Sequence, residues 1–300
     1  MDRRKFIKLT ALTGAALTLP EGLGRIVEAG EAFARPDLVV AHGGSPEQIV
    51  KVALDAMGGI RNFISRGDIV VIKPNIGWDR VPEQAGNTNP EVVSTVVKLC
   101  FEAGAKKVKV FDRPVNDPRR CYVQSGIAPA VKALGAEADY VDERKFKDME
   151  IKGQALKTWP LYSDVFEADK VINIPIAKHH GLAKLTMSFK NWMGIMGGSR
   201  RQIHQKLDES LVDLSMKIKP TLTILDAVRI LTANGPQGGS LADVRKLDTV
   251  IIGIDPVAID SYGATLFGMK GSDLGYVTIG HKLGLGQMDL NKVRIRKIQV

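Results

Sequence analysis

The sequence is poor in cysteine and in aromatic residues, and each shortage argues against a class of protein. Two cysteines are too few to hold an iron–sulfur cluster or a thiolate zinc site, so no iron–sulfur cluster is expected. Aromatic residues make up only 6% of the chain, and the basic residues are scattered along it. Nucleic-acid binding is therefore not expected. No apolar run approaches the roughly 20 residues that span a bilayer, so no stable transmembrane segment is expected.

The two cysteines leave one question open. Cys100 falls on the apolar face of an expected helix, where a buried and inert thiol is the usual state. The alternative is a disulfide between Cys100 and Cys121 in an oxidising compartment.

The chain is basic, with a net charge of +9. This balance favours an acidic or phosphate-bearing ligand. Hydrophobic residues make up 44% of the sequence, which is enough to bury a large core.

The first 34 residues have the three parts of a twin-arginine export signal. Arg3 and Arg4 form the basic pair, a short apolar run covers residues 9–20, and Ala32-Phe33-Ala34 resembles a cleavage site. We expect the twin-arginine export machinery to carry the folded protein to the periplasm or another extracytoplasmic space. An amphipathic first helix is the alternative interpretation. Residues 35–300 are then expected to form a single α/β domain.

Apolar strand patterns alternate with helical patterns through residues 35–300. This alternation predicts an α/β fold with a mostly parallel central sheet flanked by helices on both faces. Residues 144–163 break the rhythm and indicate a small antiparallel excursion. The expected strands are 38–41, 68–72, 107–111, 139–141, 170–176, 221–225, 249–254 and 293–300. The expected helices are 46–57, 90–103, 127–134, 182–193, 209–218 and 256–267.

Polar residues follow five of the expected strands. Ligands of open α/β sheets bind at the carboxyl ends of the strands, so these residues are expected to converge. They are Lys73 and Asn75, Asp112, Lys178 with His179 and His180, Asp226, and Asp255.

Lysine and histidine in this set suit chemistry on an anion. Lysine would stabilise negative charge and histidine would move a proton, so we expect Lys73, His179 and Lys190 to be catalytic. Thr88 precedes a helix start whose amides favour an anion, and Thr186 and Lys190 would share a helix face. Backbone amides of the glycine-rich loop at 234–240 could approach a ligand. The expected ligand-binding residues are Asn75, Thr88, Lys178, Asn191, Asn234 and Gly235.

Adjacent histidines on an irregular segment can also bind a metal ion. The set expected for this role is His179, His180, Asp226 and Asp255. Each residue has a plainer interpretation as well: a surface lysine, a histidine satisfied by loop hydrogen bonds, or a carboxylate that caps a helix.

As a set, these motifs resemble the family called "domain of unknown function 362" over residues 65–290. The resemblance rests on these motifs, in chain order: Lys73-Pro74-Asn75, Thr88-Asn89-Pro90, Ala103-Gly104-Ala105 with Asp112, Lys178-His179, Leu185-Thr186, Lys190-Asn191, Gly194, Asp226, Asn234-Gly235-Pro236, Gly239, and Asp255-Pro256-Val257-Ala258 with Asp260. The resemblance implies a shared fold with this family and leaves the reaction open. Some members carry ferredoxin-like cysteine motifs that this chain lacks, and twin-arginine signals occur among similar members.

The leading hypothesis is an exported protein with an active or binding cleft for a small anionic molecule, with or without a metal ion. The first alternative is a periplasmic binding or accessory protein without turnover. The second is a redox protein with a non-covalent cofactor.

Overall fold

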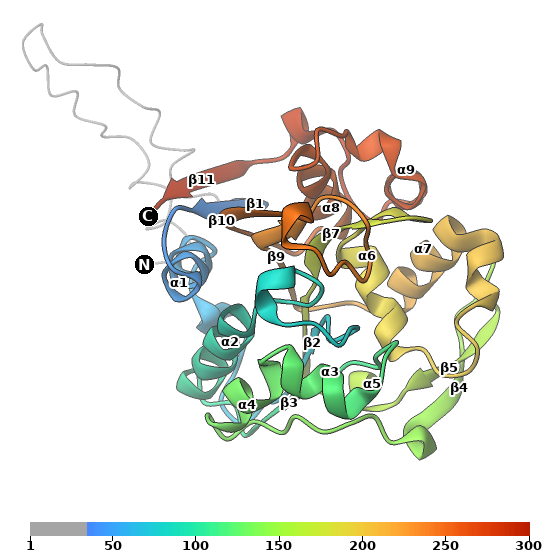
Figure 1. Ribbon diagram of the computed structural model, residues 1–300, viewed down its shortest axis with the longest axis horizontal. Helices are drawn as coiled ribbons and strands as arrows, with labels where there is room; N and C mark the ends of the chain where they lie inside the picture. The colour runs from blue at the N-terminus through green and yellow to red at the C-terminus, as the bar shows by residue number, and fades with distance from the viewer. Residues whose placement is uncertain (1–34) are drawn as a thin grey trace, which may run out of the picture. The chain divides into compact units, whose positions relative to one another are not determined.

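A nine-stranded sheet runs through residues 35–300, the part of the chain that the computed structural model describes (Figure 1). The export signal predicted in residues 1–34 lies outside that part. The strand order is β11-β1-β10-β9-β6-β2-β3, while β7 pairs with β9 and β8 pairs with β7. The strands are β1 (Leu38–His42), β2 (Ile69–Pro74), β3 (Lys107–Val110), β6 (Lys170–Ile174), β7 (Ile176–His180), β8 (Lys184–Thr186), β9 (Leu222–Leu231), β10 (Val244–Gly253) and β11 (Ile295–Gln299).

Most neighbouring strands are parallel, as the sequence predicts. Strand β2 runs parallel to β3 and β6, and β9 runs parallel to β6 and β7. Strand β10 is reversed, because it pairs antiparallel with both β9 and β1. The carboxyl ends of β2, β3, β6, β7 and β9 therefore lie at one edge of the sheet, which we call the carboxyl edge. Strand β10 ends at the opposite edge.

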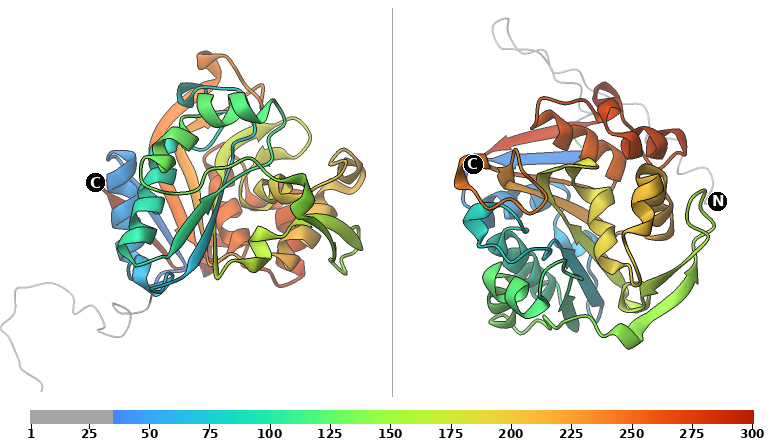
Figure 2. Two further views of the ribbon diagram at one scale, coloured as in Figure 1. Left: turned by 90° about the horizontal axis from the view of Figure 1, so that it is seen from below. Right: turned by 45° about the vertical axis from the view of Figure 1, so that its right-hand side comes forward.

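Helices cover both faces of the sheet (Figures 1 and 2). One core cluster contains side chains of α1, α2 and α4 together with the sheet, and another contains side chains of α7, α8 and α9. This arrangement confirms the predicted fold class. The helices are α1 (Pro46–Ala56), α2 (Pro90–Glu102), α3 (Pro118–Gln124), α4 (Ile127–Lys132), α5 (Asp164–Glu167), α6 (Ser188–Asn191), α7 (Leu207–Lys217), α8 (Pro256–Thr265) and α9 (Gly275–Lys282).

The predicted antiparallel excursion is also confirmed. Strands β4 (Phe146–Glu150) and β5 (Thr158–Tyr162) form a two-stranded antiparallel sheet. The buried Asp213 carboxylate accepts hydrogen bonds from three backbone amides of the connecting turn, those of residues 154, 155 and 156. The hairpin lies at the periphery of the described part, away from β1 and β11 (Figure 2).

Neither cysteine forms a disulfide. Cys100 on α2 and Cys121 on α3 are both buried in the core cluster that α1, α2 and α4 share with the sheet. Burial raises the pKa of the Cys100 thiol to about 12 and that of Cys121 to about 11, so both thiols are unreactive at neutral pH.

Three sequence predictions of secondary structure are wrong. Residues 139–141 form no strand. The strand predicted over 170–176 is interrupted at Pro175 and continues as β7, so the histidine segment is a strand and not an irregular loop. The helix predicted over 182–193 is instead β8 followed by the short α6 and a 3₁₀ turn over residues 192–195. Pairing of β8 with β7 overrides the helix propensity of that segment.

Candidate functional site

The loop that follows β2 is closed by hydrogen bonds between Asn75 and Thr88. The Asn75 amide donates to the Thr88 hydroxyl at 2.8 Å, and the Thr88 amide donates to the Asn75 carbonyl at 2.9 Å. The Thr88 hydroxyl in turn donates to the carbonyl of Ile174 at 2.7 Å. Thr88 was predicted to bind the ligand, but its hydroxyl is engaged in holding the loop against β6.

Lys73, at the end of β2, forms a fully buried ion pair with Asp112, which follows β3. Its ammonium group lies 2.9 Å from the Asp112 carboxylate and donates to Asn191 Oδ1 at 2.9 Å and to the Pro74 carbonyl at 2.6 Å. These contacts use all three ammonium hydrogens. Gly194 packs directly over the pair, because a Cβ atom there would overlap the Asp112 carboxylate. Lys73 is therefore a positioning residue in this geometry.

Asn191, at the end of α6, connects this helix to strands β2 and β6. Its Oδ1 accepts from Lys73, and from Asn75 Nδ2 at 3.3 Å. Its Nδ2 donates to the Lys73 carbonyl at 2.9 Å and to Asn173 Oδ1 at 2.8 Å. The amide is fully satisfied within the protein, so Asn191 also acts by holding its neighbours in place.

Lys178, on β7, is buried beside this network. Its ammonium donates to Asn75 Oδ1 at 3.0 Å and to the Gly86 carbonyl at 2.5 Å, and it has no carboxylate partner within residues 35–300. Burial, together with the charges of Lys190 and Lys73, lowers the pKa of Lys178 to about 7 against an opposing effect of Asp112. Lys178 is thus a cation whose charge is poorly balanced.

Lys190, on α6, is the least satisfied cation of the site. It is 8% exposed, and the only hydrogen-bond partner of its ammonium in the described residues is the sulfur of Met193, at 2.9 Å. A thioether is a weak acceptor. Burial lowers the pKa of Lys190 to about 8, and the charge of Arg200 contributes to the shift. We refer to Lys73, Lys178 and Lys190 as the lysine cluster.

The two histidines are separated by the alternation of side chains along β7, which places His180 on the same face as Lys178 and His179 on the other. His180 Nδ1 accepts from the amides of Leu182 and Ala183, both at 3.1 Å, and so fixes the turn between β7 and β8. Burial and the charges of Lys190 and Lys178 lower the pKa of His180 to about 3. His180 is therefore neutral across physiological pH.

His179 lies against the glycine-rich loop. Its Nδ1 accepts from the Gly235 amide at 3.1 Å, which leaves the proton of the neutral ring on Nε2. His179 also lines a pocket of about 540 Å³ together with Leu185, Arg245 and Phe267. The Gly235 amide is thus used within the protein. The exposed Asn234 side chain donates to Asp243 at 2.9 Å, and within residues 35–300 no hydrogen bond joins it to the lysine cluster.

The start of α2 offers no free amides for an anion, contrary to the sequence prediction. The Asn89 amide donates to the buried Asp226 carboxylate at 2.7 Å, and the Asn89 side chain accepts from the next two amides of the helix. Asp226 also accepts from the Val228 amide at 2.9 Å. Burial raises the pKa of Asp226 to about 6. Asp226 therefore joins β9 to the start of α2.

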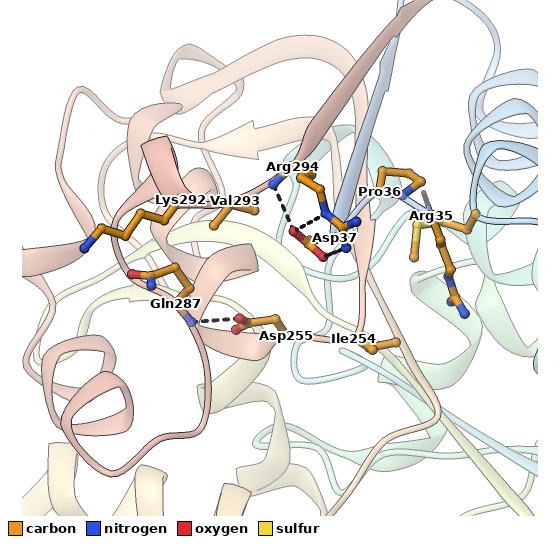
Figure 3. Close-up of a pocket in the computed structure, with 10 residues that line it drawn as sticks. Arg35, Pro36, Asp37, Ile254, Asp255, Gln287, Lys292, Val293 and Arg294 are labelled. Atoms are coloured by element: carbon orange, nitrogen blue, oxygen red, sulfur yellow. Dashed lines mark hydrogen bonds and ion pairs between the residues drawn. The ribbon is translucent and has the colours of Figure 1, made fainter. Parts of the chain in front are cut away.

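Asp255 lies away from the lysine cluster, because β10 is reversed and ends at the opposite edge of the sheet. It caps α8 by accepting from the Ala258 amide at 2.8 Å, and it also accepts from the Gln287 amide at 2.7 Å. Figure 3 shows it in a pocket of about 420 Å³, beside the ion pair between Asp37 and Arg294.

The expected metal site is not assembled. Within residues 35–300, no three His, Cys, Asp or Glu side chains are grouped so that they could hold a metal ion. His180 fixes a turn, Asp226 caps a helix start and Asp255 lies at the far edge, so the four expected ligands serve separate local roles.

Two residues that sequence reasoning did not select contribute to the site. Asp260, on α8, accepts from the Ser188 amide at 2.8 Å and the Phe189 amide at 3.2 Å, and so holds the start of α6. Arg200 lies beside Lys190 and Asp112 and alters the pKa of Lys190. Asp260 belongs to a motif that carries the family resemblance but was not assigned to the site, whereas Arg200 was visible only as part of the run Gly197-Gly198-Ser199-Arg200-Arg201.

These observations define an α/β protein with a mostly parallel sheet whose carboxyl edge carries a buried cluster of lysines and asparagines. The model of the family described as "Domain of unknown function (DUF362)" matches residues 70–265. The chain belongs to this family.

Comparisons with individual proteins add one curated relative and two solved structures. The chain is 29% identical to the thylakoid-associated protein sll1697 of Synechocystis sp. over 242 residues, which is 74% of each chain. It is 11% identical to a Thermotoga maritima protein of known crystal structure, with a TM-score of 0.44 over 75% of this chain and 60% of that one. It is 12% identical to the lactate racemase apoprotein of Thermoanaerobacterium thermosaccharolyticum, with a TM-score of 0.45 over 72% and 54%. The chain thus spans little more than half of each solved structure.

No helix in residues 35–300 has the length and the apolar character needed to cross a membrane.

Proposed function

We propose that this protein binds a small anionic molecule at the carboxyl edge of its sheet, next to Lys178 and Lys190. The observation that carries the proposal is the state of Lys190, whose ammonium is almost fully buried and meets only a thioether. Burying a charge without a partner is costly, and an anion bound beside it would remove that cost.

The charge balance supports the same conclusion. Asp112 is the carboxylate paired with the lysine cluster in the described residues, and it contacts Lys73. The charge of Lys190 lowers the pKa of Lys178, and neither lysine has a carboxylate within ion-pair distance in that part of the chain. A partly exposed rim formed by Asn75, Met193 and Arg200 surrounds them and gives the direction from which a ligand would approach.

The roles within the site follow from the contacts. Lys178 and Lys190 supply the positive charge that meets the ligand. Asn75 holds Lys178 through a hydrogen bond, and it is joined in turn to Asn191, the neighbour of Lys190 on α6. Lys73 holds Asn191 and is itself fixed by the ion pair to Asp112. His179 faces away from Lys178 on β7 and lines a pocket whose lining includes neither Lys178 nor Lys190, so the proposed anion binding does not use it.

We also propose that the protein is exported through the twin-arginine pathway. The support is the sequence of residues 1–34, with the Arg3-Arg4 pair, the short apolar run and Ala32-Phe33-Ala34.

Titration calorimetry with inorganic phosphate as the probe tests anion binding. We expect Lys190→Met to lower the affinity for phosphate at pH 7 by tenfold or more. Lys219→Met is the matched control, because Lys219 is exposed just before β9, at the edge opposite the cluster. Equal affinity of wild type and Lys190→Met for phosphate, with both proteins folded, would overturn the proposal.

A further inference from the structure

Beside the lysine cluster, two arginines join the segment that follows β3 to the segment around residues 197–201. Arg113, which follows β3, donates to the carbonyls of Met196 and Gly198 at 3.1 and 3.2 Å. Arg200 donates to the carbonyls of Arg113 and Pro114 at 2.8 and 2.9 Å. The segment of residues 197–201 is therefore held beside the end of β3 by reciprocal contacts between residues far apart in the sequence.

These contacts leave the charge of Arg200 unbalanced. Its partners are neutral carbonyls, and in the described residues no carboxylate lies within ion-pair distance of it. Arg113 is different, because it lies 3.4 Å from the Glu143 carboxylate. The Asp112 carboxylate favours the charged form of Arg200, but its own ion-pair contact is with Lys73.

Arg200 and Lys190 meet at Met193. Arg200 donates to the Met193 carbonyl at 3.4 Å, and the ammonium of Lys190 lies against the sulfur of the same residue. Lys190 and Arg200 thus bring two positive groups to the same residue, and the charge of Lys190 also acts on Lys178. Within residues 35–300, none of these three groups has a carboxylate within ion-pair distance. A singly charged ligand would leave two of these charges unbalanced in a medium where charges are weakly screened.

Building on the proposed anion site, we propose that its ligand presents a compact dianion, namely a phosphoryl group of a phosphate monoester or of free phosphate. Two ammonium groups and a guanidinium supply the charge that such a group needs. Arg200 contributes through its charge, since its hydrogen bonds already hold the rim. A dicarboxylate would spread its two charges over a longer molecule, whereas Lys190 and Arg200 meet at Met193 and Lys178 lies within reach of the Lys190 charge.

The preference for a dianion is tested by calorimetry with two probes, inorganic phosphate and acetate, at pH 7.5, where phosphate is largely dianionic. We expect wild-type protein to bind phosphate at least tenfold more tightly than acetate. Arg200→Gln is expected to lose most of this preference, and Arg200→Lys to retain it because the charge is kept. Arg201→Gln is the matched control, since Arg201 is the exposed neighbour of Arg200.

The outcomes separate this inference from the anion site itself. If acetate and phosphate bind equally, or if Arg200→Gln weakens both to the same extent, the dianion inference is wrong and the anion site stands. If neither probe binds to folded wild-type protein, both proposals fail. If succinate binds more tightly than phosphate, the inferred phosphoryl ligand is wrong and a dicarboxylate is the ligand class instead. A third probe, the phosphate monoester glycerol 3-phosphate, distinguishes the two sources of the phosphoryl group. Tighter binding of glycerol 3-phosphate than of inorganic phosphate indicates an ester ligand, and weaker binding indicates free phosphate.

Discussion

Lys190 carries a positive charge into the interior without an oxygen atom to receive its hydrogen bonds. Its pKa of about 8, against an ordinary value of 10.5, corresponds to roughly 3 kcal/mol of unfavourable free energy for the charged form. An anion bound beside Lys190, as proposed above, would stabilise the charged form and remove this cost.

The burial of Lys190 predicts a pH dependence of stability. Because its pKa in the folded protein lies below the value in the unfolded chain, the unfolded chain binds more protons between pH 8 and 10.5. The free energy of unfolding contributed by Lys190 therefore rises with pH in that window. We expect Lys190→Met to be more stable than wild type at pH 7, by up to roughly 3 kcal/mol, with a smaller difference at pH 10.

Urea unfolding of both proteins from pH 7 to 10 measures this difference. For Lys219→Met, an exposed control, the difference from wild type is expected to be small at every pH. A stability difference between wild type and Lys190→Met that does not vary with pH would contradict the assigned cause.

At the residue scale, the sequence predicts which side chains reach the carboxyl edge but not what they contact. Lys73, Asn75 and Lys178 lie together, as their positions after the expected strands imply, and hydrogen bonds among Asn75, Lys178 and Asn191 and between Lys73 and Asn191 join them. The ammonium group of Lys73 nevertheless contacts Asp112 and Asn191 and does not face a ligand site. Strand-end position cannot distinguish a lysine facing a ligand from one in an ion pair, because the distinction depends on partners more than 30 residues away.

Helix α6 is held by an element distant in the sequence. The Asp260 carboxylate on α8 accepts from the amides of Ser188 and Phe189, and burial raises the pKa of Asp260 to about 7. Only four residues long, α6 cannot be stable alone, so its position depends on this contact. The orientation of Lys190 and Asn191 follows from the same contact.

We expect Asp260→Ala to destabilise the protein by roughly 2 kcal/mol, because two buried amides lose their acceptor. It should also lower the affinity for phosphate, since α6 carries Lys190. Asp255→Ala is the matched control: this residue caps α8 in a similar way, at the opposite edge. It should lose roughly 1 kcal/mol of stability and leave phosphate affinity unchanged. Thermal unfolding and calorimetry measure both quantities, and an equal effect of the two variants on phosphate affinity would contradict this role of Asp260.

At the element scale, prediction succeeds where the signal is local. Ser45 and Asn89 cap α1 and α2 as their sequence positions imply, and both helices begin where expected. Prediction from sequence fails for residues 182–193, where pairing of β8 with β7 and the contact of Asp260 with the start of α6 determine the secondary structure. The direction of β10 is also invisible to hydrophobic periodicity, since a buried strand has the same pattern in either orientation. That reversal is why Asp255 lies away from the site.

At the scale of the whole molecule, export provides a test that does not depend on the ligand. The double variant Arg3→Lys, Arg4→Lys keeps the positive charge and removes the arginine pair. We expect it to remain in the cytoplasm of a bacterial host, while the wild-type chain reaches the periplasm, as measured by cell fractionation and immunoblotting. Lys8→Arg is the control and should be exported. Export of the double variant at the wild-type level would contradict the pathway.

The pairing of β1 sets the order in which the protein can mature. Leu38, which begins β1, lies opposite Gly253 of β10 and Ile295 of β11. The strand next to the proposed signal therefore gains its neighbours only after almost the whole chain has left the ribosome. Until then, β1 is an unpaired apolar strand joined to that signal. A translocase that accepts only finished proteins could use this late closure as a checkpoint, since a nascent or truncated chain would present β1 uncovered.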